Sequence, residues 1–252
     1  SSLSKSNHDL NLSPVESDIE GLRGIAVLAI VLFHVNGLWL PGGFVGVDVF
    51  FVISGYLITR NIAANLDDKT FSFSDFYAKR VRRISPAAMM TIFASFVIGC
   101  ILFTEYDLRN LCHGVLAAVL GSTNVYETYF ADYGYFAAKS AMNPLLHLWS
   151  LAVEEQFYFV WPMVMKQLWQ FPFRMRIGVV GLIIVASFVW AQIAAPSSFA
   201  YYMLPCRAGE LLVGALTALL LRDLNDDDVL RRGRSSKILI SVVGLVGFAA
   251  VA

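Results

Sequence analysis

The sequence predicts an all-α fold, a polytopic bundle of transmembrane helices with about 7–8 spans in this chain. Of its 252 residues, 57% are hydrophobic and only 15% are charged, whereas soluble domains carry about 25% charged residues. The mean hydropathy is +0.63. The 19 basic and 19 acidic residues cancel, which argues against a nucleic-acid-binding protein. Too few charges remain to solvate a surface in water, so the composition indicates a membrane protein.

Apolar runs long enough to cross a bilayer, roughly 20 residues each, recur along the chain. They lie at about 24–41, 43–58, 86–103, 148–165, 177–195 and 204–221. A further run starts at Ile238 and is still apolar at Ala252, so we expect a fragment that lacks its C-terminal part. The stretch 110–121 has only about twelve apolar residues, so it is either a short span or a re-entrant segment.

The uneven distribution of basic residues predicts the orientation. No Lys or Arg lies between Arg23 and Arg60, and six follow from Arg60 to Arg83. By the positive-inside rule, that basic connection and the N-terminus are cytoplasmic. The connection 122–147 contains one Lys or Arg, which is Lys139. Such a low content of basic residues fits an external location if 110–121 does not span the membrane.

The chain divides into two parts by composition. Residues 1–17 are expected to form a disordered polar cytoplasmic tail, and residues 18–252 an integral-membrane domain that is incomplete at its C-terminus. The three cysteines are widely spaced in apolar stretches, so neither a disulfide framework nor a metal site is predicted.

Ionisable side chains within spans are functional candidates, because each costs about 2.5–3.5 kcal/mol on insertion. Arg23 and His34 are 11 residues apart, which places both on one helix face, roughly 16 Å apart along the axis. A histidine can take a proton from a hydroxyl, and an arginine can hold a phosphate or carboxylate. The alternatives are a buried structural histidine and an interfacial arginine paired with Asp18 or Glu20.

The segment HLWSLAVEEQFYFVWP, residues 147–162, contains a second candidate group. His147 and Glu154 are seven residues apart and share one face if the helix already includes His147. Because Glu154 and Glu155 are adjacent, at most one of them faces the same interior as His147. A carboxylate there can act as an acid or orient a hydrogen-bonding partner. The aromatic residues of the segment, Trp149 among them, are expected mainly to pack.

Small and charged residues mark two further spans. Ser54 and Gly55, within FFVISG, favour close backbone packing or a pore-lining hydroxyl over a nucleophile, because a G-x-S-x-G elbow is missing. Asp48 is expected to face a water-filled cavity or the outer interface. Arg207 and Glu210 are an i,i+3 pair, for which a mutual ion pair is an equal alternative.

A basic cluster precedes the predicted span at 86–103. Within KRVRRISP, Arg80 and Arg83 are three residues apart on one helix face. Contact with anionic lipid would explain such a cluster. A phosphate site at the start of a helix is the functional alternative.

Together these segments resemble acyltransferase family 3, the integral-membrane O-acyltransferases that modify bacterial surface polysaccharides. Five motifs follow in the family's order over residues 18–215. They are Arg-x10-His (Arg23, His34), Phe-Phe-x-x-Ser-Gly (Phe50, Phe51, Ser54, Gly55), Arg-x-x-Arg (Arg80, Arg83), His-x-Trp-Ser-Leu-x-x-Glu-x-Gln-Phe-Tyr (147–158) and the Arg/Glu span around Arg207 and Glu210.

The resemblance implies an acyl-CoA donor, usually acetyl-CoA, no permanently bound cofactor, and a hydroxyl of a glycan or lipid-linked saccharide as acceptor. Joined to the geometry above, it makes His34 the general base or acyl relay and places the donor phosphates on arginines. The implied catalytic residues are His34, Glu154 and His147, the donor-binding residues are Arg23, Arg80 and Arg83, and the residues along the substrate path are Asp48, Ser54, Trp149, Ser150, Arg207 and Glu210.

The expected location is the bacterial cytoplasmic (inner) membrane, with several passes, a cytoplasmic N-terminus, membrane lipid as a partner and no nucleic acid. The competing hypothesis is a proton-coupled transporter, which would use the same buried His, Asp and Glu residues. Carriers often contain inverted repeats, and the sequence shows no such symmetry. Transfer of label from acetyl-CoA to surface glycan would distinguish the two classes.

Overall fold

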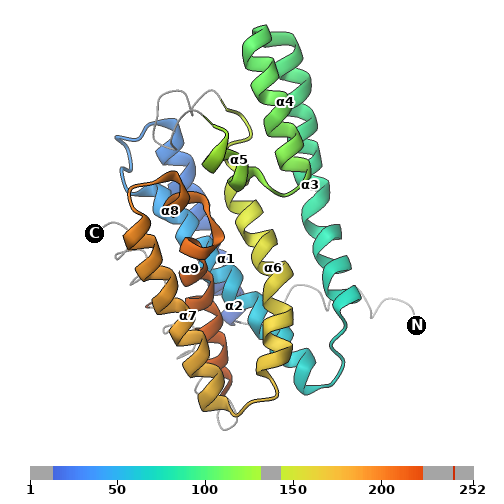
Figure 1. Cartoon of the computed structure of the whole chain (residues 1–252), viewed down its shortest axis with the longest axis vertical. Helices are drawn as coiled ribbons and strands as arrows, with labels where there is room; N and C mark the ends of the chain where they lie inside the picture. The colour runs from blue at the N-terminus through green and yellow to red at the C-terminus, as the bar shows by residue number, and fades with distance from the viewer. Residues whose placement is uncertain (1–13, 132–142, 224–240, 242–252) are drawn as a thin grey trace, which may run out of the picture. The chain divides into compact units, whose positions relative to one another are not determined.

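The computed structural model describes residues 14–131, 143–223 and 241. The described residues form helices joined by turns, with no strand among them, which confirms the predicted all-α class. The elements are α1 (Pro14–Val35), η1 (Gly43–Val45), α2 (Gly46–Asp67), α3 (Phe73–Leu102), α4 (Glu105–Val119), α5 (Thr123–Tyr129), α6 (Leu148–Leu168), α7 (Phe173–Ala194), α8 (Ser198–Tyr202) and α9 (Leu204–Asp223) (Figure 1).

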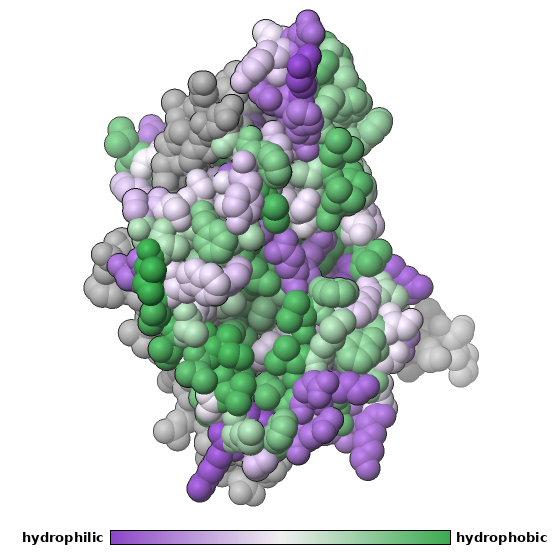
Figure 2. Space-filling view, in the orientation of Figure 1, coloured by the Kyte–Doolittle hydropathy of each residue, from purple (hydrophilic) through white to green (hydrophobic). Residues whose placement is uncertain are grey.

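Within the described part, four helical segments are long and apolar enough to cross a membrane. They are Gly43–Asp67, Phe73–Leu102, Phe173–Ala194 and Ser198–Arg222. Large apolar side chains are exposed along α7, including Leu182, Val185 and Ile193, and hydrophobic atoms cover the side of α7 that faces the viewer in Figure 2. Such a surface is stable against lipid, as expected of a multi-pass membrane protein.

Several predicted boundaries shift. The first predicted span, 24–41, ends early because α1 stops at Val35, before the turn residues Asn36 and Gly37. The helix also begins at Pro14, inside the predicted tail 1–17, whose residues 1–13 lie outside the described part. Proline suits the first helical turn because it has no amide hydrogen to leave unpaired.

The later boundaries shift as well. The span predicted at 86–103 starts much earlier, because Ser72 caps α3 by accepting a hydrogen bond from the Asp75 amide at 3.4 Å. The stretch 110–121 falls mostly within α4. The last predicted run, which begins at Ile238, lies outside the described residues except for 241.

The chain forms two compact units, one comprising residues 1–60 and 210–252 and the other residues 61–209. In the first unit, α1, α2 and α9 share an apolar core that includes Ile19, Val52 and Ala218. Gly55 on α2 lies against the backbone of Leu211, and Gly214 on α9 lies against the backbone of Val52. Glycine is needed at these two contacts because a Cβ atom would overlap main-chain atoms.

In the second unit, α3 and α4 form a helical hairpin, at the top of Figure 1. Gly99 of α3 admits the Leu111 side chain of α4. A buried cluster of Ile92, Leu111, Leu145 and Leu148 joins this hairpin to the start of α6. The long axis of α3 therefore runs beside α6, and the space between these two helices forms part of the candidate site.

Candidate active site

His34 lies near the C-terminal end of α1, in the first unit. Its Nδ1 atom is 2.8 Å from the carbonyl oxygen of Ile30. Because a carbonyl only accepts hydrogen bonds, Nδ1 is the donor, and in the neutral imidazole this leaves the lone pair on Nε2. The side chain is exposed rather than buried, unlike the structural histidine that was the alternative. This tautomer has the form that a general base requires.

Arg23 occupies the same continuous helix as His34. The side chain is partly buried, and α1 is unbroken between the two residues. The predicted separation of roughly 16 Å at 1.5 Å per residue therefore holds. The structure places Arg23 and His34 on one element, separated along its axis rather than in contact.

The other candidates of the first unit belong to α2 and α9. Asp48 is 4% exposed in the first turn of α2, and Glu210 is 6% exposed on α9. Ser54 is partly buried and precedes Gly55, where the backbones of the two helices meet. The close approach predicted for Ser54-Gly55 is thus present, and both buried carboxyl groups lie on the two helices that make it.

In the second unit, Glu154 is linked to Arg80 through a tyrosine. The Tyr158 hydroxyl donates a hydrogen bond to Glu154 Oε2 at 2.9 Å. The Arg80 guanidinium lies 5.2 Å from the centre of the Tyr158 ring and 5.7 Å from that of Phe76. A cation over an aromatic face is attracted by the ring quadrupole. From the sequence, Tyr158 was expected mainly to pack, and this link was not predicted.

The beginning of α6 contains the other predicted residues of this segment. His147 is exposed at the N-cap, and its carbonyl accepts a hydrogen bond from the Ser150 hydroxyl at 3.3 Å. Trp149 is 2% exposed and packs against Tyr201 and Tyr202, with ring centres 5.0 and 5.4 Å away. Trp149 therefore has the packing role that was favoured for the aromatic residues.

Arg207 is held among the same aromatic rings. Its Nε donates to the Tyr201 carbonyl at 2.7 Å, and its guanidinium lies 4.7 Å from the Tyr201 ring centre and 5.7 Å from that of Trp149. These contacts fix the side chain between α6 and α8.

A polar cavity of about 240 Å³ lies at the start of α3. Its basic side chains are Lys79, Arg80 and Arg83, and Asp75 is the acidic residue in its lining. The structure thus brings together the predicted pair Arg80 and Arg83 and adds Lys79. The remaining lining residues are Asn61, Asn65, Thr70, Phe71, Ser72 and Phe76.

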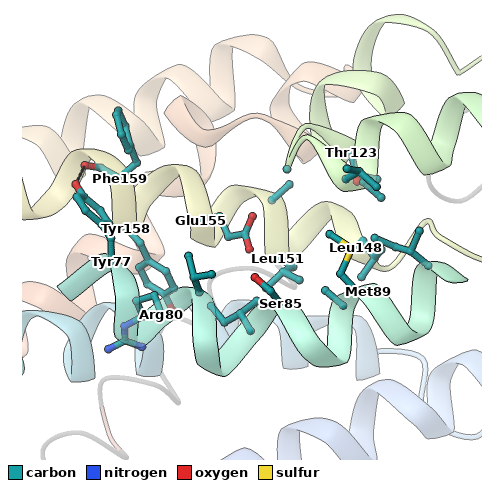
Figure 3. Close-up of a pocket in the computed structure, with 18 residues that line it drawn as sticks. Tyr77, Arg80, Ser85, Met89, Thr123, Leu148, Leu151, Glu155, Tyr158 and Phe159 are labelled. Atoms are coloured by element: carbon teal, nitrogen blue, oxygen red, sulfur yellow. Dashed lines mark hydrogen bonds between the residues drawn. The ribbon is translucent and has the colours of Figure 1, made fainter. Parts of the chain in front are cut away.

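A second cavity of about 270 Å³ lies between α3 and α6. Its walls are mostly apolar, and Glu155 of α6 points into it opposite Ser85 of α3 (Figure 3). Arg80 lines both cavities. Glu155 was not among the predicted site residues, because the sequence did not indicate which of the two adjacent carboxylates faces a cavity. Ser85 was also missed, and its one signal was its position after the basic cluster.

A buried polar network beside α6 was missed entirely. Asn124 is 0% exposed and exchanges two hydrogen bonds with Gln156, at 3.2 and 2.8 Å. Glu127 is 1% exposed, and its Oε1 accepts a hydrogen bond from Asn143 at 2.7 Å. Burial raises the pKa of Glu127 to about 7, and the hydrogen bond from Asn143 opposes that rise. The one feature of the sequence that could have indicated this network is the polarity of residues 122–128.

The described residues contain no group of three or more His, Cys, Asp or Glu side chains arranged to hold a metal ion. The first unit offers the exposed imidazole of His34, and the second unit offers a basic cavity and an apolar cavity that contains a carboxylate. Arginines can hold an anionic substrate, and an imidazole can move a proton.

One family model and several curated proteins match this chain. Residues 16–252 match the family model described as an acyltransferase domain. The chain is 34% identical over 236 residues to the peptidoglycan O-acetyltransferase OatA of Listeria monocytogenes, covering 90% of this chain and 37% of OatA. It is 37% identical over 208 residues to YrhL of Bacillus subtilis, provisionally named a peptidoglycan O-acetyltransferase, covering 80% of this chain and 32% of YrhL.

A protein of Staphylococcus aureus (strain COL), provisionally named an O-acetyltransferase, is 37% identical over 213 residues, which cover 80% of this chain and 34% of that protein. The chain therefore spans about a third of the length of these curated relatives. No solved structure matches the chain significantly.

Proposed function

The chain belongs to the acyltransferase-domain family, and from this membership we propose that it is a membrane O-acetyltransferase that uses acetyl-CoA as donor. The proposed acceptor is a glycan hydroxyl of peptidoglycan, the polymer named for two of its relatives. The proposed location is the bacterial cytoplasmic membrane, with the donor bound on the cytoplasmic side.

The observation that carries the proposal is the basic cavity at the start of α3. Lys79, Arg80 and Arg83 converge there on a space of about 240 Å³. Guanidinium and ammonium groups bind phosphate oxygens by charge-assisted hydrogen bonds. The nucleotide portion of acetyl-CoA carries several phosphate charges, which gives it the complementary chemistry. Arg23, on α1, is proposed as a further phosphate ligand.

In the proposed reaction, the acceptor hydroxyl attacks the thioester carbonyl carbon of the donor. His34 Nε2 takes the hydroxyl proton, the new C–O bond forms, and the C–S bond breaks to release CoA as a thiolate. The proton then passes from His34 to that thiolate, so the products are the acetyl ester and the CoA thiol. His34 is equally suited to carry the acetyl group transiently on Nε2, because that nitrogen has the lone pair.

Glu154 and His147 are proposed to support the proton transfer. Glu154 is held by the Tyr158 hydroxyl, and His147 stands exposed at the start of the same helix. The residues Asp48, Ser54, Trp149, Ser150, Arg207 and Glu210 remain proposed as the polar and aromatic surroundings of the substrate path.

The test is transfer of labelled acetyl from acetyl-CoA in membranes that contain the protein and peptidoglycan fragments. His34→Ala should lower the transfer rate about 100-fold or more, the contribution typical of a general base. Arg80→Ala with Arg83→Ala should raise the KM for acetyl-CoA. The control is His113→Ala, because His113 is an exposed histidine on α4 outside the site. Wild-type membranes that neither bind acetyl-CoA nor transfer its label would overturn the proposal, as would full activity of His34→Ala.

A further inference from the structure

The cavity between α3 and α6 is long and narrow. On α3 its lining extends from Tyr77 to Ile92, and on α6 from Leu148 to Phe159. At 1.5 Å per residue these stretches are about 22 and 16 Å long. A volume of about 270 Å³ is near the lower end for ligand pockets, which measure roughly 300–1,000 Å³. This shape suits a linear chain better than a ring system.

Polar groups occupy only a few positions along this cavity. Arg80 and two tyrosines, Tyr77 and Tyr158, lie at one end, and Glu155 and Ser85 face each other farther along (Figure 3). Most of the remaining lining is aliphatic, and it includes Val81, Ile84, Ala88, Met89, Leu148 and Leu151. A ligand in this space would therefore be largely apolar, with a hydrogen-bonding group at the level of Glu155.

Glu155 has no hydrogen bond or ion pair to any residue in the described part of the chain. Its Oε2 lies beside Gly121, at 2.9 Å from where a Cβ atom of that residue would be. Gly121 also has a φ of +62°, a conformation that other residues rarely adopt. A half-buried carboxylate without a partner is costly, so a ligand that donates a hydrogen bond to Glu155 would gain affinity.

The neighbouring cavity indicates what kind of ligand this is. Arg80 lines both spaces, so a molecule with its phosphates among Lys79, Arg80 and Arg83 can extend a linear group past Arg80 toward Glu155. The pantetheine arm of the proposed donor is linear and contains two amide N–H groups and a hydroxyl. A sugar ring needs more hydrogen-bonding partners than the aliphatic walls provide.

We propose that Glu155 is a donor-binding residue that accepts a hydrogen bond from the pantetheine arm. Ser85, on the opposite wall of the cavity, is proposed as a second residue that contacts the arm. This inference rests on the proposed function, because it takes acetyl-CoA as the donor. It adds a role that differs from those of Glu154 and His34. Glu155 sets the affinity for the donor and takes no part in the proton transfer.

The test compares the KM and kcat of Glu155→Ala, Glu155→Gln and Ser85→Ala for acetyl-CoA. Loss of a hydrogen bond to a charged group should raise the donor KM about 10-fold or more in Glu155→Ala, with little change in kcat. Glu155→Gln should recover part of the affinity, because the amide oxygen still accepts a hydrogen bond. With S-ethyl thioacetate, a donor that lacks the arm, wild type and Glu155→Ala should have the same kcat/KM.

The matched control is Glu105→Gln, since the Glu105 side chain is 95% exposed on α4. An unchanged donor KM in Glu155→Ala, or a rise in the acceptor KM alone, would overturn the inference while leaving the proposed function intact. If wild type transfers no acetyl group, equilibrium binding of CoA to the solubilised protein still tests Glu155 separately from the proposed function. If Glu155→Ala does not fold, Glu155→Gln and Ser85→Ala still measure the contribution of the pair.

Discussion

Glu154 and Glu155 are neighbours in sequence, yet their side chains meet different surroundings. Successive residues on a helix point about 100° apart, so Glu154 meets Tyr158 of its own helix while Glu155 faces the cavity beside α3. The sequence predicted that at most one of them would share the interior with His147. It could not predict which one faces a cavity, because that depends on the side of α6 against which α3 packs.

Glu127 leads to a prediction about pH. Burial raises the pKa of its carboxyl from the ordinary 4.5 to about 7 in the folded protein. Below pH 4.5 the carboxyl is neutral in both the folded and the unfolded state. Between pH 4.5 and pH 7 the unfolded carboxyl ionises while the buried carboxyl stays neutral, so stability is lost as the pH rises, and the loss is complete once the folded group also ionises. This rise in the pKa corresponds to about 3 kcal/mol of stability.

We therefore expect the unfolding temperature of the detergent-solubilised protein to decrease as the pH is raised from 5 to 8. The decrease should be smaller in Glu127→Gln, because the glutamine side chain does not titrate. Thermal unfolding curves across this range measure the effect. Glu105→Gln serves as the control, because its exposed side chain should leave the wild-type slope unchanged. Equal slopes in wild type and Glu127→Gln would contradict the assignment of this titration to Glu127.

The sequence predicted which long apolar segments become helices better than it predicted where those helices begin and end. The spans predicted at 148–165 and 177–195 fall largely within α6 and α7. Hydropathy missed the start of α3, because its first turns are basic while its beginning is set by the Ser72 cap. The short helices α5 and α8 were also missed, since seven and five residues are too few to show a helical period.

The packing of α2 against α9 gives a prediction about stability. A Cβ atom on Gly55 would overlap the Leu211 backbone, which cannot move as a flexible side chain can. We expect Gly55→Ala to lower the free energy of unfolding by about 1–3 kcal/mol, the usual cost of overpacking. Thermal unfolding in detergent measures the change.

Gly21→Ala provides the matched control for this substitution. Gly21 also lies on a helix of the first unit, but nothing is within 4 Å of where its Cβ atom would be. Alanine favours a helix over glycine by up to about 1 kcal/mol, so this variant should be as stable as wild type or more stable. A Gly55→Ala variant that matched Gly21→Ala would show that the two helices do not need their close contact.

The lengths of α3 and α4 bear on how the chain crosses the bilayer. The positive-inside rule predicts a cytoplasmic connection before α3. The α3 helix has 30 residues, about 45 Å at 1.5 Å per residue, which is more than the ~30 Å hydrocarbon core. The α4 helix has 15 residues, about 22 Å, and is too short to return across that core. The length of α4 thus favours the re-entrant alternative over a span at 110–121.

Cysteine labelling tests this topology at three exposed positions of the second unit. Asp68 precedes α3, Glu105 begins α4, and Tyr129 ends α5. In a chain whose native cysteines are replaced by serine, a membrane-impermeant maleimide should label Glu105→Cys and Tyr129→Cys in intact spheroplasts. It should label Asp68→Cys only after permeabilisation, because the basic connection is expected to be cytoplasmic. If Tyr129→Cys and Asp68→Cys are both protected from the maleimide in intact spheroplasts, α4 spans the membrane instead. If only Asp68→Cys is labelled, the orientation is the reverse of the predicted one.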